Sequence, residues 1–200
     1  MIRLSRPTDL RALREICLRT GDSGQDATGL WSDDGLLPDV FLEPYVLLEP
    51  STVWVVEADA RAVGYLVATF DTRRFVERWS ERWTPIFADR HPRTAVDANE
   101  QWLRDAGYNA SLLLNEHVEN FPAHLHIALL PRAQGRGSGR ALMGAVGLAA
   151  TEAGVPGIHL GVGLANLSAR AFYERLGFHE LSAAADTVWL GIAPERLLSL

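Results

Sequence analysis

The residues best suited to chemistry lie in a glycine-rich loop, Gln134-Gly135-Arg136-Gly137-Ser138-Gly139. Three glycines within five residues remove side chains, so backbone N–H groups can approach a ligand closely. The unpaired amides of a helix's first turn and the helix dipole attract anions, and Arg132, Arg136 and Arg140 add positive charge. The loop therefore predicts a site for phosphate groups, although a simple tight turn between a strand and a helix remains an alternative.

Two regular elements must hold this loop in place. Residues 125–130 are apolar enough for an inner strand, and Pro131 ends it because proline cannot donate to a sheet. Behind the loop, apolar residues recur at helical spacing between residues 140 and 154, so the loop also begins a helix. The Gly-Lys-Ser/Thr of a Walker loop and the full dinucleotide-binding fingerprint do not occur here.

A second strand and helix follow within the next forty residues. Residues 157–162 predict a strand, and residues 166–178 predict a helix that Asn166 or Ser168 caps and Gly177 ends. Together the two segments resemble the GNAT superfamily of acyl-CoA-dependent acyltransferases. The resemblance is carried by Gln134-x-x-Gly137-x-Gly139 and by Asn166-x-x-Ala169-x-x-Phe172-Tyr173-Glu174-x-Leu176-Gly177-Phe178, and it covers residues 124–180.

A looser resemblance suggests a subfamily. Bacterial acetyltransferases related to the acetyltransferase-like C-terminal domain of O-GlcNAc hydrolases share a similar combination of features. These are a Gly-Asp-Ser-Gly segment at residues 21–24, the Pro44-Tyr45 step, a helical insert and Phe121-Pro122-Ala123-His124-Leu125-His126-Ile127. These relatives do not indicate an acceptor.

The GNAT resemblance implies a binding site for acetyl-CoA. The backbone at Leu129 and Leu130 pairs with the pantetheine arm, and an amide near Leu129 polarises the thioester carbonyl. The amides of residues 134–139, with Arg140 at the start of the helix, hold the pyrophosphate, and Asn166 lies near the pantetheine. Tyr173 takes the place of the general acid that protonates the departing thiolate, the alternative being a core aromatic residue.

Transfer to an amine also requires a base or a chain of water molecules, because an amine is protonated at neutral pH. The candidates are His124 and His126, whose ordinary pKa near 6.5 suits the task, and Asp22 or Asp26 acting through water. The family resemblance places these aspartates on the acceptor side, and a plain surface loop is the alternative. The two histidines fall one residue nearer the loop than the His-x-His pair of some relatives. Since a one-residue offset reverses the face of a strand, they can instead point into the core.

Composition narrows the class of protein. Of 200 residues, 48% are hydrophobic and 22% charged, which is typical of a soluble globular protein. The absence of a long apolar run and of a signal-peptide core predicts a cytoplasmic protein without a membrane partner. The net charge of −6 argues against nucleic acid and favours a cationic or neutral acceptor. The only cysteine, Cys17, lies on an apolar helical face, so we expect neither a disulfide, a thiol nucleophile nor a metal site.

The remaining segments predict an α/β (α+β) architecture. We expect strands at residues 2–4, 53–58, 62–70 and 186–192, a helix at 7–19, short helical turns within 36–48, and helices at 73–83 and 94–106. The family resemblance implies a mixed, mostly antiparallel central sheet flanked by helices and splayed between strands 125–130 and 157–162. We expect residues 1–200 to form a single domain with a helical insert at about residues 71–120, which covers the acceptor cleft or makes a homodimer contact.

The function expected from the sequence is that of an acetyl-CoA-dependent N-acetyltransferase. It moves the acetyl group directly to an amine, either a small amine or a protein lysine or N-terminus. The alternative is a module that binds acetyl-CoA without turnover.

Overall fold

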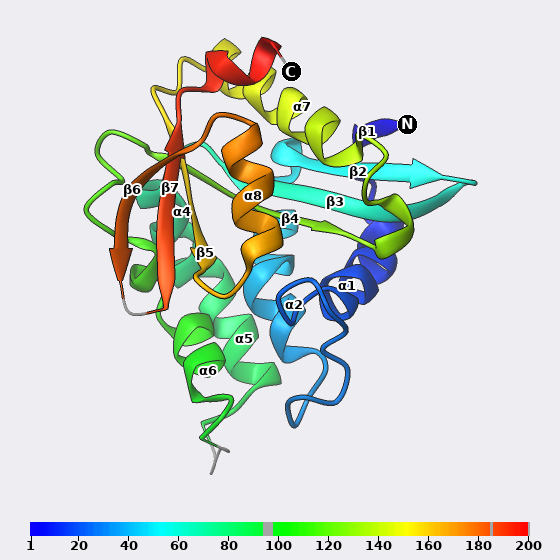
Figure 1. Cartoon of the computed structure of the whole chain (residues 1–200). Helices are drawn as coiled ribbons and strands as arrows, with labels where there is room; N and C mark the ends of the chain where they lie inside the picture. The colour runs from blue at the N-terminus through cyan, green and yellow to red at the C-terminus, as the bar shows by residue number, and fades with distance from the viewer. Residues whose placement is uncertain (94–97, 185, 200) are drawn as a thin grey trace.

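The fold is built on a seven-stranded sheet with strand order β1-β2-β3-β4-β5-β7-β6 (Figure 1). The computed structural model describes residues 1–93, 98–184 and 186–199. Every strand pair is antiparallel except β4–β5, so the sheet is mixed and mostly antiparallel, as the family resemblance implies. The strands are β1 (Ile2–Leu4), β2 (Val53–Ala58), β3 (Arg61–Thr69), β4 (Ala123–Leu129), β5 (Ile158–Gly163), β6 (His179–Ala184) and β7 (Thr187–Ile192).

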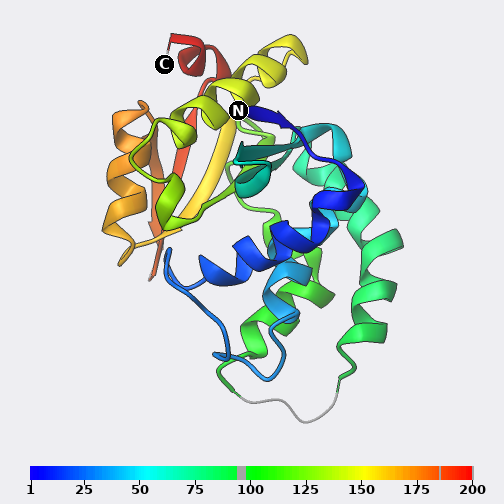
Figure 2. The same ribbon diagram turned by 90° about the vertical axis from the view of Figure 1, so that its right-hand side faces the viewer.

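Helices cover both faces of the sheet. One core lies between the sheet and α7, α8 and the C-terminal 3-10 turn at Pro194–Ser199; the other lies between the sheet and α1 to α6. Figure 2 shows the two groups on either side of the strands. The helices are α1 (Leu10–Arg19), α2 (Leu36–Phe41), α3 (Glu43–Leu48), α4 (Thr72–Arg78), α5 (Thr84–Arg90), α6 (Gln101–Tyr108), α7 (Ser138–Glu152) and α8 (Leu167–Arg175).

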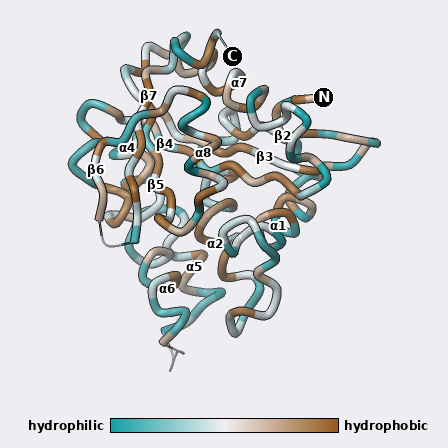
Figure 3. The backbone as a smooth tube through the Cα atoms, viewed as in Figure 1, coloured by the Kyte–Doolittle hydropathy of each residue, from teal (hydrophilic) through white to brown (hydrophobic). Residues whose placement is uncertain are grey.

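Strand β4 separates the two cores. Its side chains alternate, as they must in an extended strand: Leu125 and Leu129 pack toward α7 and α8, while Ala128 faces the helices of the N-terminal half. The hydropathy colouring shows this central strand as hydrophobic, whereas the outer loops are largely hydrophilic (Figure 3). Within the described ranges, no helix combines the length and apolarity needed to cross a membrane.

The sheet opens between β4 and β5. These parallel strands pair only at Ala123 with Ile158 and at His124 with His159, and then diverge. On its other side β4 stays paired with β3 from Thr69–His124 to Gly64–Leu129 without a register shift. The predicted splay is therefore confirmed, and it leaves the second half of β4 with a free edge toward β5.

The helical insert between β3 and β4 differs in detail from the prediction. The helix expected at residues 73–83 is α4 followed by a π-helical turn at Trp79–Trp83, and the helical backbone continues directly into α5 at Thr84. Pro85 lies in the first turn of α5, where its missing N–H removes no helical hydrogen bond. The helix expected from residue 94 begins at Gln101, and residues 94–97 lie outside the described residues.

Tryptophans anchor the insert. The indole Nε1 of Trp79 donates to the carbonyl of Gly107 (3.1 Å) in α6, and that of Trp83 donates to the carbonyl of Asp39 (2.9 Å) in α2. Gly107 is required for this packing, because a Cβ there would lie 2.1 Å from the ring of Phe87. The insert is thus fixed both internally and against α2.

The C-terminal region adds a strand that the sequence did not reveal. β6 pairs with β7 at the edge of the sheet, and β7 pairs with β5, as expected for the final strand. The sequence of β6, HELSAA, consists of exposed and half-buried residues and lacks the apolar alternation that marks a strand. The caps of α8 are as predicted: Asn166 accepts from the Ala169 amide, and Gly177 ends the helix at φ 90°.

Candidate active site

The glycine-rich loop leads into α7, whose N-terminus has no side-chain cap. Gly137 is the N-cap of α7 with φ 79°, and no side chain of the described residues accepts from the first-turn amides. Gly135 is also left-handed, with φ 68°, and nothing lies within 4 Å of the position that a Cβ would take at either glycine. Gly139 differs, since a Cβ there would lie 2.9 Å from Phe172 of α8. The first two glycines therefore keep the loop open, and the third allows α8 to pack closely.

The surroundings of the loop are cationic. Arg132, Arg136 and Arg140 are exposed, and none of them forms an ion pair with another described residue. Beside Gly137 and Arg140, a pocket of about 560 Å³ opens between α7 and the C-terminal turn. An anion at this helix end would meet backbone amides, the positive end of the dipole and unpaired guanidinium groups together.

The free edge of β4 runs toward this loop. The amide of Leu130 donates to the Val63 carbonyl of β3 (3.0 Å), whereas the amide of Ala123 donates to Gly157 on the opposite side (3.2 Å). Because amide directions alternate along a strand, the N–H of Leu129 points into the splay. Gln134 bonds the carbonyl of Leu129 through Nε2 (2.9 Å) and so ties the loop to this edge. Leu129 thus presents a free amide, and the amide of Leu130, a predicted pantetheine contact, is used within the sheet.

Helix α8 borders the splay on the side of α7. The side-chain oxygen of Asn166 accepts from the Ala169 amide (3.1 Å), which leaves its NH₂ group free to donate. Tyr173 is 7% exposed and packs between Phe172 and Phe178, with ring centroids 5.2 and 5.3 Å away. No other described residue bonds to its hydroxyl, and burial raises the pKa of Tyr173 so that the phenol stays protonated. Tyr173 is therefore part of the core and also a potential proton donor.

The two histidines of β4 face the N-terminal helices. His124 is buried, with Nε2 2.7 Å from the Tyr45 hydroxyl and Nδ1 2.7 Å from the Thr72 hydroxyl. His126 is half-buried, its Nε2 lies 3.1 Å from the same Tyr45 hydroxyl, and Phe41 packs edge-on against its ring. Desolvation lowers the pKa of both histidines, that of His126 to about 4 with a further contribution from His159. Both rings are therefore neutral at pH 7, and the pKa of each histidine lies below the value near 6.5 for which the two were expected to suit a base.

Comparison with known proteins identifies the family. The model of the acetyltransferase (GNAT) family matches residues 18–178, which include the loop, the splay and α8. The chain belongs to the GNAT acetyltransferase family. The resemblance to relatives of the O-GlcNAc hydrolases stays a prediction.

Solved structures share the fold of this GNAT chain. The protein titled SsHAT is 40% identical, with a TM-score of 0.93, over 97% of this chain and 98% of that chain. An N-acetyltransferase from Staphylococcus aureus Mu50 is 16% identical with a TM-score of 0.64, over 96% of this chain and 100% of that chain. The ribosomal-protein-S18-alanine N-acetyltransferase from Escherichia coli is 17% identical with a TM-score of 0.54, over 96% and 92%. The last two show the fold alone.

The aspartates proposed for the acceptor side of this GNAT chain lie in an exposed turn after α1. Asp22 pairs with Gln25 through the backbone, and Asp26 accepts from the Thr28 amide (2.9 Å) and hydroxyl (2.5 Å). The bonds from Thr28 lower the pKa of Asp26. Neither carboxylate forms a hydrogen bond or ion pair with the histidines of β4 in the described structure.

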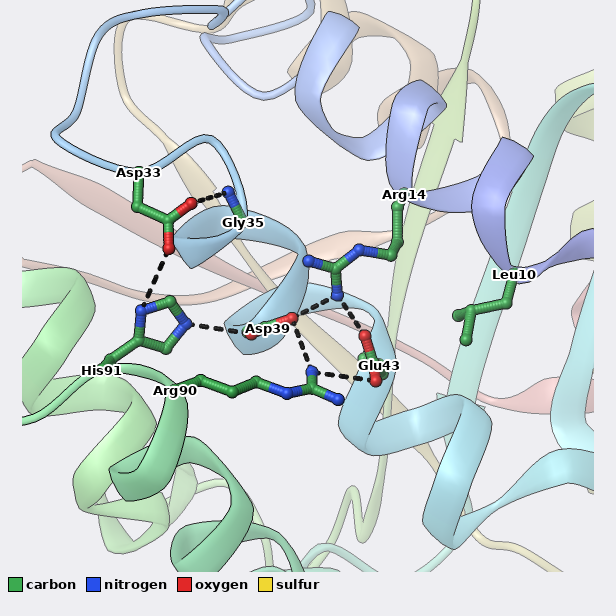
Figure 4. Close-up of a pocket in the computed structure, with 8 residues that line it drawn as sticks. All are labelled: Leu10, Arg14, Asp33, Gly35, Asp39, Glu43, Arg90 and His91. Atoms are coloured by element: carbon green, nitrogen blue, oxygen red, sulfur yellow. Dashed lines mark hydrogen bonds and ion pairs between the residues drawn. The ribbon is translucent and has the colours of Figure 1, made fainter.

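A second, charged pocket of about 530 Å³ shares no lining residue with the glycine-rich loop or the splay (Figure 4). Arg14 of α1 and Arg90 of α5 both pair with Asp39 and Glu43 of α2 and α3, and His91 Nε2 lies 2.9 Å from Asp39. The charges of these residues neutralise one another, and their ion pairs connect the insert to the N-terminal helices. Sequence reasoning missed this cluster, because its members are spread from residue 14 to residue 91 without a recognisable motif.

Sequence reasoning also missed the polar roles of Tyr45 and Thr72. The sequence marks Tyr45 only as part of the subfamily resemblance, and the structure adds a hydroxyl shared by both histidines. The Pro44-Tyr45 step is the one signal that marks the position, and it does not show where the hydroxyl points.

Proposed function

We propose that this protein is an acetyl-CoA-dependent N-acetyltransferase that transfers the acetyl group directly to an amine. The observation that carries this proposal is the free edge of β4 at Leu129, which runs from the splay to the uncapped N-terminus of α7. An edge with unpaired amides can pair with an extended amide-containing arm, and a helix N-terminus can bind its phosphate end. The pantetheine and diphosphate of coenzyme A have this order of groups.

The residues of the loop fit a diphosphate. Gly135 and Gly137 leave room for close approach, the first-turn amides of α7 supply donors, and Arg136 and Arg140 supply charge. The NH₂ group of Asn166 is available to the pantetheine arm. The amide of Leu129 would hydrogen-bond the thioester carbonyl oxygen and stabilise the negative charge that develops on it during attack.

The proposed reaction forms a C–N bond and breaks the C–S bond of the thioester. The ammonium group first loses one proton to solvent, because only a neutral nitrogen has a lone pair for attack. The neutral nitrogen then attacks the carbonyl carbon, and its second proton passes to His126, directly or through water. Tyr173 donates a proton to the departing thiolate. Cys17 takes no part, since it is buried at 4% exposure and burial raises the pKa of its thiol to about 11. The transfer therefore needs no covalent enzyme intermediate.

The acceptor side favours a cationic amine. The loop of residues 20–35 carries no basic residue and four aspartates, of which Asp33 faces the charged pocket beside His91 and the other three, Asp22, Asp26 and Asp34, are exposed. Next to it, Phe41 packs against both His126 and Trp102, which is 52% exposed. Acidic and aromatic groups both attract ammonium ions. We therefore propose a protonated amine as the substrate class, attached either to a small molecule or to a peptide.

The decisive experiment measures turnover. Free thiol is followed while the protein is incubated with acetyl-CoA and a panel of primary amines and lysine-containing peptides. We expect thiol release that depends on both acceptor and enzyme, with acetylated product found by mass spectrometry. Coenzyme A binding without release for any amine would instead support the non-catalytic binding module. The assay has an internal advantage: all nineteen basic residues are arginine, so the chain's own side chains give no acetyl-lysine background.

A further inference from the structure

Four polar side chains form a continuous hydrogen-bonded chain beneath the splay. It runs from the Pro122 carbonyl to the Thr72 hydroxyl (2.7 Å) and on to Nδ1 of His124 (2.7 Å). From Nε2 of His124 it continues to the Tyr45 hydroxyl (2.7 Å) and ends at Nε2 of His126 (3.1 Å). The chain links α3, the first turn of α4 and strand β4.

The direction of each bond follows from counting protons. A carbonyl can only accept a hydrogen bond, so the Thr72 hydroxyl donates its single proton to the Pro122 carbonyl. The same hydroxyl must therefore accept from Nδ1–H of His124. His124 is buried and neutral, so its Nε2 carries no proton and accepts from Tyr45. The Tyr45 proton is then committed, and Tyr45 can only accept from Nε2–H of His126. A neutral His126 with its proton on Nε2 has a bare lone pair on Nδ1.

The Pro122 end of the hydrogen-bonded chain limits what this chain of side chains can do. A backbone carbonyl accepts a hydrogen bond but cannot pass a proton onward. The hydrogen-bonded chain that ends at Pro122 therefore cannot conduct protons away from His126. It can, however, select one tautomer of His126 over the other. The opposite tautomer would place the lone pair of Nε2 against the lone pairs of Tyr45, whose only proton is already donated.

We propose that Tyr45, His124 and Thr72 are positioning residues that hold His126 as the Nε2–H tautomer and make its Nδ1 the proton acceptor for the substrate amine. The inference rests on the proposed function for its role in catalysis, but the tautomer itself does not depend on turnover. No described residue bonds to Nδ1 of His126, and no carboxylate of the described chain forms an ion pair with this ring. The titratable groups around it are Tyr45, His124 and His159.

Nitrogen NMR of the histidine side chains tests the tautomer directly. At pH 7, without substrates, we expect His126 to carry its proton on Nε2. His124 is expected to carry it on Nδ1, and so is His159, whose Nδ1 lies 2.7 Å from the Phe121 carbonyl. The two tautomers give different patterns of long-range couplings, so the spectrum contains its own reference. A proton on Nδ1 of His126, or a doubly protonated ring, overturns the inference even if the enzyme turns over.

Substitution of Tyr45 tests the consequence. Tyr45→Phe keeps the ring stacked on Phe75 (4.5 Å) but removes the shared hydroxyl. We expect a mixed tautomer signal for His126 and a kcat about tenfold lower with an unchanged KM for acetyl-CoA, part of the roughly 10²–10⁴-fold that a general base supplies. Tyr65→Phe removes another fully buried hydroxyl from the same core and should change neither readout.

A second pair of variants tests the same inference in case Tyr45→Phe folds poorly. Thr72→Val removes the hydroxyl at the anchored end, whereas Thr72→Ser keeps it. We expect the mixed tautomer signal and the reduced kcat in Thr72→Val and near-normal values in Thr72→Ser. Equal spectra and equal kcat in the two variants overturn the positioning role. Wild-type protein that shows the expected tautomer but no turnover instead contradicts the proposed function and leaves the hydrogen-bonded chain intact.

Discussion

The buried carboxylate of Asp39 should be a main source of stability for the contact between the insert and the N-terminal helices. Asp39 is 1% exposed and accepts from His91 (2.9 Å), from Arg90 (3.2 Å) and from Arg14. Desolvation opposes its ionisation, but the hydrogen bonds from His91 and Arg14 and the charges of both arginines outweigh it. The pKa of Asp39 is therefore lowered.

Asp39→Asn removes the charge and keeps the shape. Breaking a buried ion pair costs about 3–5 kcal/mol. Here Arg14 and Arg90 are partly exposed and retain Glu43, so we expect a loss at or just below that range, about 2–3 kcal/mol. At about 2–4 °C per kcal/mol for a chain of this size, the melting temperature should fall by about 4–12 °C. Asp89→Asn, an exposed neighbour of Arg90, is the matched control and should fall by less than about 2 °C.

The pH dependence gives an independent check. A carboxylate with a lowered folded pKa contributes stability above its unfolded pKa, about 3.9, and loses it as pH falls through the folded value. The difference between wild type and Asp39→Asn should therefore be full at pH 7 and shrink below about pH 4. Urea unfolding at several pH values measures it. Equal stability of the two proteins at pH 7, or a difference that persists undiminished in acid, would refute the reasoning.

Three further predictions concern the site and its support. Tyr173→Phe should lower kcat by about 10²-fold at unchanged affinity for coenzyme A, and steady-state kinetics showing normal kcat would remove Tyr173 as the acid. Burial lowers the pKa of His126 in the folded protein to about 4, whereas the same ring in the unfolded chain has a pKa of about 6.5. Between these two pH values the unfolded chain therefore binds more protons than the folded protein. Stability should then decline from pH 6.5 toward pH 4 by up to about 3 kcal/mol for this residue; a melting temperature that is flat over this range in wild type, or equally steep in His126→Gln, would contradict it. Gly107→Ala should cost about 1–3 kcal/mol through its clash with Phe87, and an unchanged urea midpoint would show that the ring can move.

The parts of the fold that the sequence predicts are those with strong local signals. The glycines of residues 135–139, the proline at 131 and the capping Asn166 each specify a backbone conformation through their own side chain or its absence. The splay was also expected, but from the family resemblance. The register of β4 could not be predicted, because it depends on pairing with β3, and this pairing decides which face the histidines occupy.

The site was less accessible to sequence reasoning wherever its geometry is long-range. Tyr45, Thr72 and His126 are up to 81 residues apart, and only the folded chain brings their polar atoms together. The charged cluster at Asp39 has the same origin. The edge strand β6 was missed for a different reason: its half-exposed side chains need little apolar periodicity when one face is not fully covered.

The central claim is that the main chain of residues 134–140 binds the diphosphate of coenzyme A, and isothermal titration calorimetry tests it most directly. Gly137→Glu places a negative side chain at the start of α7, whereas Gly154→Glu makes the same change at the exposed far end of the helix. Both positions have similar left-handed backbones, φ 79° and 68°, and open surroundings. We predict that wild type and Gly154→Glu bind coenzyme A alike and that folded Gly137→Glu does not bind. Equal binding by all three proteins, or none by the wild type, would contradict the account.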